Sequence, residues 1–191
     1  MENKRNYSEV EFVKNFVATY KANGGDADKL AKRTVGNNGY AVGQSFTLTG
    51  EILVKENEIN GTKQTYLVLP TEEGTELSLM GLMGVSSLKG YDLENVVNIE
   101  FIEGTTKKTR PVQTEVIADF DFENVFKPAS RNFLEFAGMI AENEVNLKGK
   151  VATFLGTVVK PITAKKDGEQ NGEKYKKGYT RAIETKLWSV E

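Results

Sequence analysis

The sequence predicts an α+β protein that is mainly β: a small barrel or sandwich of about seven strands, with an N-terminal helix and one internal helix. Several short runs alternate apolar and polar residues, which is typical of strands that are buried on one face. Only two segments show convincing helical spacing. Because strands and helices do not alternate along the chain, a parallel, doubly wound sheet is not expected.

The first element is predicted to be a helix. Ser8 and Glu11 have the spacing of a capping box, in which a Ser side chain and a Glu three residues later cap the helix start. An apolar stripe follows at helical spacing and consists of Val13, Phe16, Val17 and Tyr20. The run Asn23-Gly24-Gly25 ends this helix. A second short helix is expected over residues 26–32, followed by a loop over residues 36–43.

From residue 44 the pattern changes to β. One face of the expected strand carries Phe46, Leu48, Ile52 and Val54, and the other carries polar residues. Asn60-Gly61 is a strong hairpin signal, so residues 63–69 are expected to return as the partner strand.

The middle of the chain is predicted to hold three further strands. They cover residues 76–80, 95–104 and 111–123, and the segment 105–111 is expected to be a polar loop. The glycine-punctuated segment 81–91 fits either a short helix or a loop.

An internal helix is predicted near residues 130–142, with Ser130 as its N-cap and with four inward side chains, Phe133, Phe136, Ala137 and Ile140. A final β section begins near residue 148. Its two strands, which reach residue 160 and cover residues 178–190, are joined by a long polar hairpin arm, residues 160–180, called the arm below. We expect residues 1–35 to be a helical segment that packs on a single β-rich domain, residues 36–191.

Two hairpins show a similar design. Each strand places a glycine, Gly50 or Gly156, seven residues after another glycine, and each is followed by an Asn-Gly tip and by a Lys and a Tyr. A glycine in mid-strand permits the bend or bulge of a curled strand. The pattern fits the hairpins of a small oligonucleotide-binding (OB) type barrel, and it also fits two unrelated hairpins.

The composition argues against an enzyme. The chain contains no His and no Cys, so Ser-His-Asp and Cys-His catalysis, thiol nucleophiles and cysteine-based zinc sites are excluded. The glycines of GLMGVSSLKG do not match the spacing of a phosphate-binding P-loop. We therefore expect a non-catalytic protein without a cofactor or a resident metal ion.

Charge and hydropathy give a second set of exclusions. No apolar run approaches the ~20 residues that a membrane helix needs, and residues 1–12 lack the apolar region of a signal peptide. We therefore expect a soluble protein that is not secreted by a signal peptide and makes no membrane contact; its location is left open, a virion or a host cytoplasm being two candidates. The net charge of −2 differs from the strongly basic balance of most duplex-DNA binders, so any basic surface must be local.

The arm carries the strongest basic cluster. Between Lys160 and Arg181 there are seven basic and three acidic residues, a local net charge of +4. Tyr175 and Tyr179 are four residues apart, so on one extended strand they would share a face and could stack two bases. The alternative is a solvated hairpin that contacts a neighbouring subunit. The residues for either role are Lys107, Lys108, Arg110, Lys165, Lys166, Lys174, Tyr175, Lys176, Lys177, Tyr179, Arg181 and Trp188.

An acidic stripe is predicted on the strand over residues 111–123. Glu115, Asp119, Asp121 and Glu123 share one face and offer the oxygen ligands that Mg²⁺ or Ca²⁺ prefers. Same-face neighbours on a strand are about 6–7 Å apart, so one row of carboxylates does not surround a cation. The stripe is better interpreted as a solvated or partner-facing surface.

Two functions follow from these patterns. The first is a structural or assembly subunit of an oligomeric particle, such as a component of a bacteriophage virion, that acts through contacts with protein subunits. The alternative is a single-stranded nucleic-acid-binding protein on an OB-like barrel, which uses the basic and aromatic residues of the arm.

Overall fold

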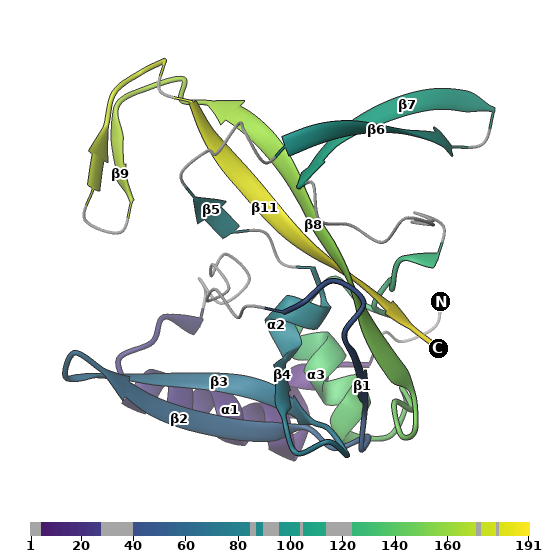
Figure 1. The fold of residues 1–191 in the computed structure, drawn as a ribbon. Coiled ribbons are helices and arrows are strands. Elements are labelled where there is room, and N and C mark those ends of the chain that lie inside the picture. The colour runs from purple at the N-terminus through teal and green to yellow at the C-terminus, as the bar shows by residue number, and fades with distance from the viewer. Residues whose placement is uncertain are drawn as a thin grey trace.

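The computed structural model describes residues 5–27, 40–84, 87–89, 96–103, 105–113, 124–170, 173–178 and 180–191. It confirms an α+β protein that is mainly β (Figure 1). The expected second helix falls almost wholly outside these ranges, as does most of the strand predicted over residues 111–123.

The N-terminal helix forms where its apolar stripe predicts. Helix α1 spans Glu11–Ala22 and buries Val13, Phe16 and Tyr20. The predicted Ser8 capping box is wrong, because Ser8 lies in a 3₁₀ turn, η1 (Tyr7–Glu9), and its backbone N–H donates to the side chain of Asn6. Gly24, at φ +84°, follows the helix end, and such a conformation favours glycine.

The segment before α1 is attached to the second long helix. This helix, α3, spans Phe133–Ala141 and buries Phe133, Phe136, Ala137 and Ile140 as predicted. Its N-cap is Asn132 rather than Ser130: the Asn132 side chain accepts a 3.1 Å hydrogen bond from the Glu135 N–H. Beyond the helix, Arg5 bonds to Glu142 and Glu144, and Tyr7 covers Gly138, where a Cβ would lie 2.9 Å from the Tyr7 ring.

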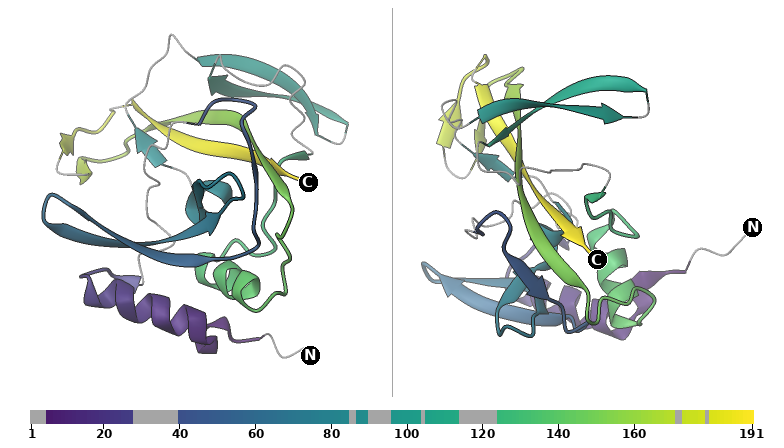
Figure 2. Two further views of the ribbon diagram at one scale, coloured as in Figure 1. Left: turned by 60° about the horizontal axis from the view of Figure 1, so that its bottom comes forward. Right: turned by 45° about the vertical axis from the view of Figure 1, so that its right-hand side comes forward.

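The first β section forms a three-stranded sheet. Its strands are β2 (Leu53–Ile59), β3 (Thr62–Pro70) and β4 (Glu76–Ser78), in the order β2-β3-β4. Asn60 and Gly61 both have positive φ, 51° and 75°, which is the conformation of the tight hairpin turn that the sequence predicts. Figure 2 shows α1 lying along this sheet with α3 beside it.

The middle section differs from the prediction at two points. The expected strand over residues 76–80 ends at Ser78, where the short helix α2 (Leu79–Leu82) begins; β5 (Ser87–Lys89) follows. The predicted polar loop 105–111 is wrong, because Thr106–Gln113 forms strand β7, paired with β6 (Val96–Glu103). Pairing with an adjacent strand gives this lysine-rich segment a β conformation that its own composition does not favour.

A long twisted ladder forms the second sheet. Strands β8 (Val151–Thr163) and β11 (Thr180–Val190) pair antiparallel, and the order is β5-β11-β8-β7-β6, with β1 (Ser45–Thr47) also paired to β8. The bend expected at Gly156 is confirmed: the register shifts between Leu187 and Trp188, opposite Gly156 and Phe154. Within the arm, β9 (Gly168–Gln170) and β10 (Glu173–Tyr175) form a separate small hairpin.

The predicted barrel or sandwich is not confirmed as a closed structure. The described strands fall into sheets of six, three and two strands. The division into residues 1–35 and 36–191 stays a prediction, although α1 contributes Phe16 and Tyr20 to the same core as the strands. No helix within the described ranges is long and apolar enough to cross a membrane.

Strand β1 joins the two larger sheets. Phe46 pairs with Ala152 of β8, while the next residues turn to β3, where Leu48 forms a bridge with Thr71 and the Thr49 N–H donates to Pro70 O at 3.1 Å. Gly50, at φ +88°, then bends the chain towards β2. A Cβ at this position would lie only 2.8 Å from Lys148 Cβ, which is too close for any residue other than glycine. Phe46, Leu48 and Ile52 of this stretch belong to the buried hydrophobic core.

The Glu73 carboxylate reinforces this junction. Both of its oxygens accept the Thr47 backbone N–H at 2.9 Å. These hydrogen bonds hold the pKa of the Glu73 carboxyl below its usual value. The carboxylate thus substitutes for a paired strand at one N–H of β1.

We expect Glu73→Gln to lower the melting temperature at pH 7 and to have less effect in acid. Because the folded-state pKa is depressed, the stabilisation is present above the ordinary carboxyl pKa of about 4.3 and is lost as pH falls through the folded value. Thermal melts at pH 7 and at lower pH, with Glu72→Gln as a matched control in the same turn, test this. A melting-temperature difference that does not change with pH would contradict it.

Candidate functional site

The arm lies between β8 and β11 and carries the separate two-stranded hairpin β9–β10. Asp167 holds its base: Asp167 Oδ1 accepts the Lys177 N–H at 2.8 Å, and Oδ2 accepts Lys176 Nζ at 3.1 Å. The Lys177 N–H, followed by the Lys176 ammonium, lowers the pKa of Asp167. This carboxylate therefore organises the arm, although it also neutralises part of its charge.

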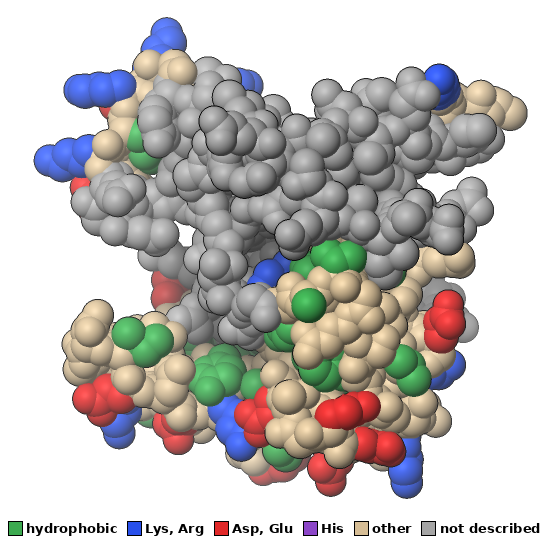
Figure 3. All heavy atoms as spheres, viewed as in Figure 1, with side chains coloured by type: hydrophobic (Ala, Val, Ile, Leu, Met, Phe, Trp, Pro, Cys, Tyr) green, Lys and Arg blue, Asp and Glu red, His purple; other side chains and the backbone are tan. Residues whose placement is uncertain are grey.

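The arm presents its lysines to solvent. In Figure 3 several blue side chains project from the upper left corner, which holds the β9–β10 hairpin, whereas most of the red side chains lie in the lower half of the face shown. Five predicted residues are exposed there: Lys165, Lys166, Lys174, Lys176 and Lys177. The structure thus brings together the lysines that the sequence singled out within the arm.

The predicted pair of stacking tyrosines is not supported. Strand β10 ends at Tyr175 and a turn with Gly178 at φ +88° follows, so the extended strand expected for the pair does not continue past Tyr175. Tyr175 is half-buried and lies over Gly168, where a Cβ would be 2.4 Å from the Tyr175 hydroxyl oxygen. Tyr179 itself lies outside the described residues.

Trp188 is a core residue, which corrects its assignment as a ligand-binding candidate. Its side chain is 1% exposed and packs against Phe154, Phe46 and Tyr40, at ring-centroid distances of 5.2, 6.3 and 4.9 Å. A ring enclosed in this way offers no face to a base or a partner.

The second basic cluster lies on a different hairpin. Lys107 is exposed on β7, and the backbones of Lys108 and Arg110 pair with Phe101 and Ile99 of β6. Arg181 pairs with Ile162 near the base of the arm. The β6–β7 hairpin and the arm project separately from the β8–β11 ladder (Figures 1 and 2).

The acidic stripe of residues 115, 119, 121 and 123 lies outside the described residues. Within the ranges that are described, no group of three or more Asp and Glu side chains is placed to hold a metal ion.

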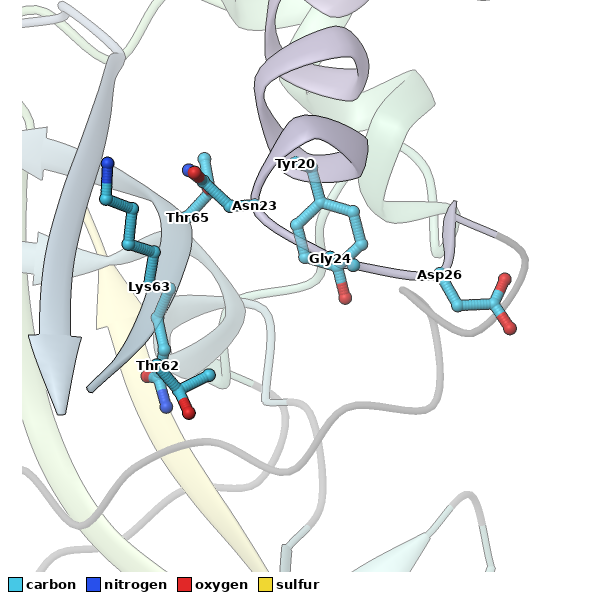
Figure 4. A pocket seen from close by; sticks show the side chains of 9 residues that line it. Tyr20, Asn23, Gly24, Asp26, Thr62, Lys63 and Thr65 are labelled. Carbon is cyan, nitrogen blue, oxygen red and sulfur yellow. The ribbon is translucent and has the colours of Figure 1, made fainter. Parts of the chain in front are cut away.

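A polar pocket lies between the end of α1 and the start of β3. It has a volume of about 340 Å³ and is lined by Tyr20, Asn23, Lys63 and Thr65, among others. Figure 4 shows Asn23 directed towards Thr65, and its Nδ2 donates to Thr65 Oγ1 at 2.8 Å and to Glu56 Oε1 at 2.6 Å. These bonds tie the helix to the sheet, so the pocket is explained as a structural junction.

An aromatic and basic pair at the edge of the core was missed by sequence reasoning. Tyr40 is half-buried, and Lys186 Nζ lies 5.1 Å from the centroid of its ring. Phe154 and Phe46 approach the same ring at centroid distances of 5.6 and 6.0 Å. No spacing in the sequence connects Tyr40 with Lys186, because only the folded sheet brings residues this far apart together.

Comparisons with known proteins give no relative for this chain. No protein-family model matches it, and searches of curated protein sequences and of solved structures return no significant similarity.

Proposed function

We propose that the chain binds single-stranded nucleic acid through the arm, on an OB-like arrangement of five strand segments. Numbered along the chain, the first segment is β1 with β2, bent at Gly50, and the second is β3. The third consists of β4 and β5, on either side of α2; the fourth is β8 and the fifth is β11.

The pairing of these segments supports the arrangement. The first pairs with the second through β2–β3 and with the fourth through β1–β8. The third pairs with the second through β3–β4 and with the fifth through β5–β11, and the fourth pairs with the fifth. Each segment therefore has two neighbours, as in a partly open five-stranded barrel.

One observation carries the proposal: the basic arm is the connection between the fourth and fifth segments. In OB folds, this connection and the one between the first two strands are the loops that bind oligonucleotides. Here the connection between the first two segments is the short Asn60-Gly61 turn. The order of the segments and the surface charge are independent arguments, and both indicate the arm as the binding element.

The chemistry of the arm suits a phosphate backbone. Its five exposed lysines are point charges on flexible stems, which contact phosphates without reading bases. We expect binding that is insensitive to sequence and strongly sensitive to salt.

Fluorescence anisotropy with a labelled strand of ~30 nucleotides, a length that covers several OB-type sites, tests the proposal. The affinity should fall between 50 and 200 mM salt by about 2.5-fold for each phosphate contact. A duplex of the same length and an uncharged polymer serve as controls. Absence of binding to the single strand at 50 mM salt would refute the function.

The separation of an acidic and a basic region on the chain favours a second candidate function, a subunit that assembles with other protein subunits. Residues 51–76 contain six glutamates and two lysines, so the β2–β3–β4 region is acidic where the arm is basic. In a particle such as a phage virion, the arm of one subunit would contact this region of the next. The mass in solution at low salt decides this: assembly requires values well above 21.2 kDa without nucleic acid.

A further inference from the structure

We propose that Tyr40 stacks a base of the bound strand and that Lys186, which covers its ring in the free protein, moves to an adjacent phosphate. The inference rests on the proposed function and identifies a second contact that lies outside the arm.

Tyr40 is half-buried and has contacts on both the core side and the strand side of its ring. Three aromatic residues, Phe46, Phe154 and Trp188, support the ring from the core. Lys186 is half-buried, and a lysine keeps its ammonium group near water while its stem packs on apolar surface. We therefore infer that a base would stack on the ring face beneath the Lys186 ammonium, which lies 5.1 Å from the ring centroid.

Magnitudes allow a base to replace the lysine. A cation over a tyrosine ring contributes about 2- to 5-fold to an equilibrium at an exposed site and about 30-fold when it is desolvated. A stacked base contributes about 5- to 150-fold to affinity. The ammonium that leaves the ring can then contact a phosphate of the bound strand.

The position of this pair connects it with the arm. Side chains alternate along a strand, so Lys186 and Trp188 lie on the same face of β11. The register shift between Leu187 and Trp188 does not change this, because the unpaired residue of the bulge is on β8. Thr180, where β11 leaves the arm, lies about 20 Å from Lys186 at roughly 3.4 Å per residue. A single strand could therefore contact the arm and Tyr40 together along β11.

The test compares an oligothymidine strand with an abasic strand of equal length, which keeps the phosphates and lacks the bases. The unmodified protein should bind the thymidine strand about 5- to 150-fold more tightly. Tyr40→Leu, which retains apolar packing, should reduce this preference by that factor, whereas Tyr40→Phe should preserve it. Lys186→Gln should lower the salt slope by about 0.7, the value for one contact on a single strand.

The outcomes separate this inference from the proposed function. Equal binding of both strands by the unmodified protein would leave the arm as a phosphate contact and refute stacking at Tyr40. Absence of binding to either strand would refute both ideas. If Tyr40→Leu does not fold, photocrosslinking of a 5-bromodeoxyuridine strand to the unmodified protein replaces it, and failure to crosslink at Tyr40 would refute the inference.

Discussion

Trp188→Ala should lower the free energy of unfolding by about 3–5 kcal/mol, the range for a large aromatic side chain lost from a packed core. Trp188 is 1% exposed and lies where β11, β8 and β1 meet, in contact with Phe154 and Phe46. Its removal leaves a cavity where these strands meet. The cavity is not filled, because strands held in hydrogen-bonded sheets move little to close it.

Trp188→Phe is the matched control and should cost much less. The Trp188 Nε1 atom is buried, and it has no hydrogen-bond partner among the residues that the structure describes. An unsatisfied buried donor destabilises the folded state by about 1–3 kcal/mol. Phenylalanine eliminates this cost, which offsets part of the stability lost with the smaller ring.

Urea denaturation followed by far-UV circular dichroism measures both variants without relying on the fluorescence of this single tryptophan. Equal losses for the alanine and phenylalanine variants would contradict the packing argument, because both remove the indole N–H and only alanine removes the aromatic ring. A loss below 1 kcal/mol for alanine would contradict the buried position.

Replacing the five exposed arm lysines by glutamine should weaken binding to single strands by about 100-fold or more at 50 mM salt. If each of Lys165, Lys166, Lys174, Lys176 and Lys177 neutralises one phosphate, the five together give a salt slope of about 3.5. That slope corresponds to about 100-fold between 50 and 200 mM salt. The variant should bind weakly at both concentrations and show a much flatter dependence.

A second five-lysine variant separates local from overall charge. Lys14, Lys21, Lys127, Lys148 and Lys150 are exposed and lie outside the arm. Their replacement by glutamine changes the net charge equally, and it should leave most of the salt slope intact. Equal weakening by the two variants would show that binding follows net charge rather than the arm.

Local patterns predicted the elements that depend on near neighbours in the chain. The stripe of α1, the inward face of α3 and the Asn60-Gly61 turn all have short-range causes, and the structure confirms them. The caps were assigned less well. Asn6 and Asn132 act where Ser8 and Ser130 were expected, because several small polar residues in each region are able to accept a backbone N–H.

Strand β7 shows why composition alone fails for part of the sheet. Thr106–Gln113 is rich in lysine and threonine and carries a proline, which suggested a loop. Pairing with β6 satisfies its backbone groups, and this depends on a neighbouring strand rather than on the segment itself.

The sequence by itself determined the mainly β class, the two long helices, the hairpin turn, the arm and its cluster of lysines, because each depends on residues close together in the chain. Only the tertiary structure decided which aromatic side chains are accessible. It buried Trp188, turned Tyr175 onto Gly168 and brought Lys186 over Tyr40. Exposure depends on which distant segments cover a side chain, and no local pattern of residue types contains that information.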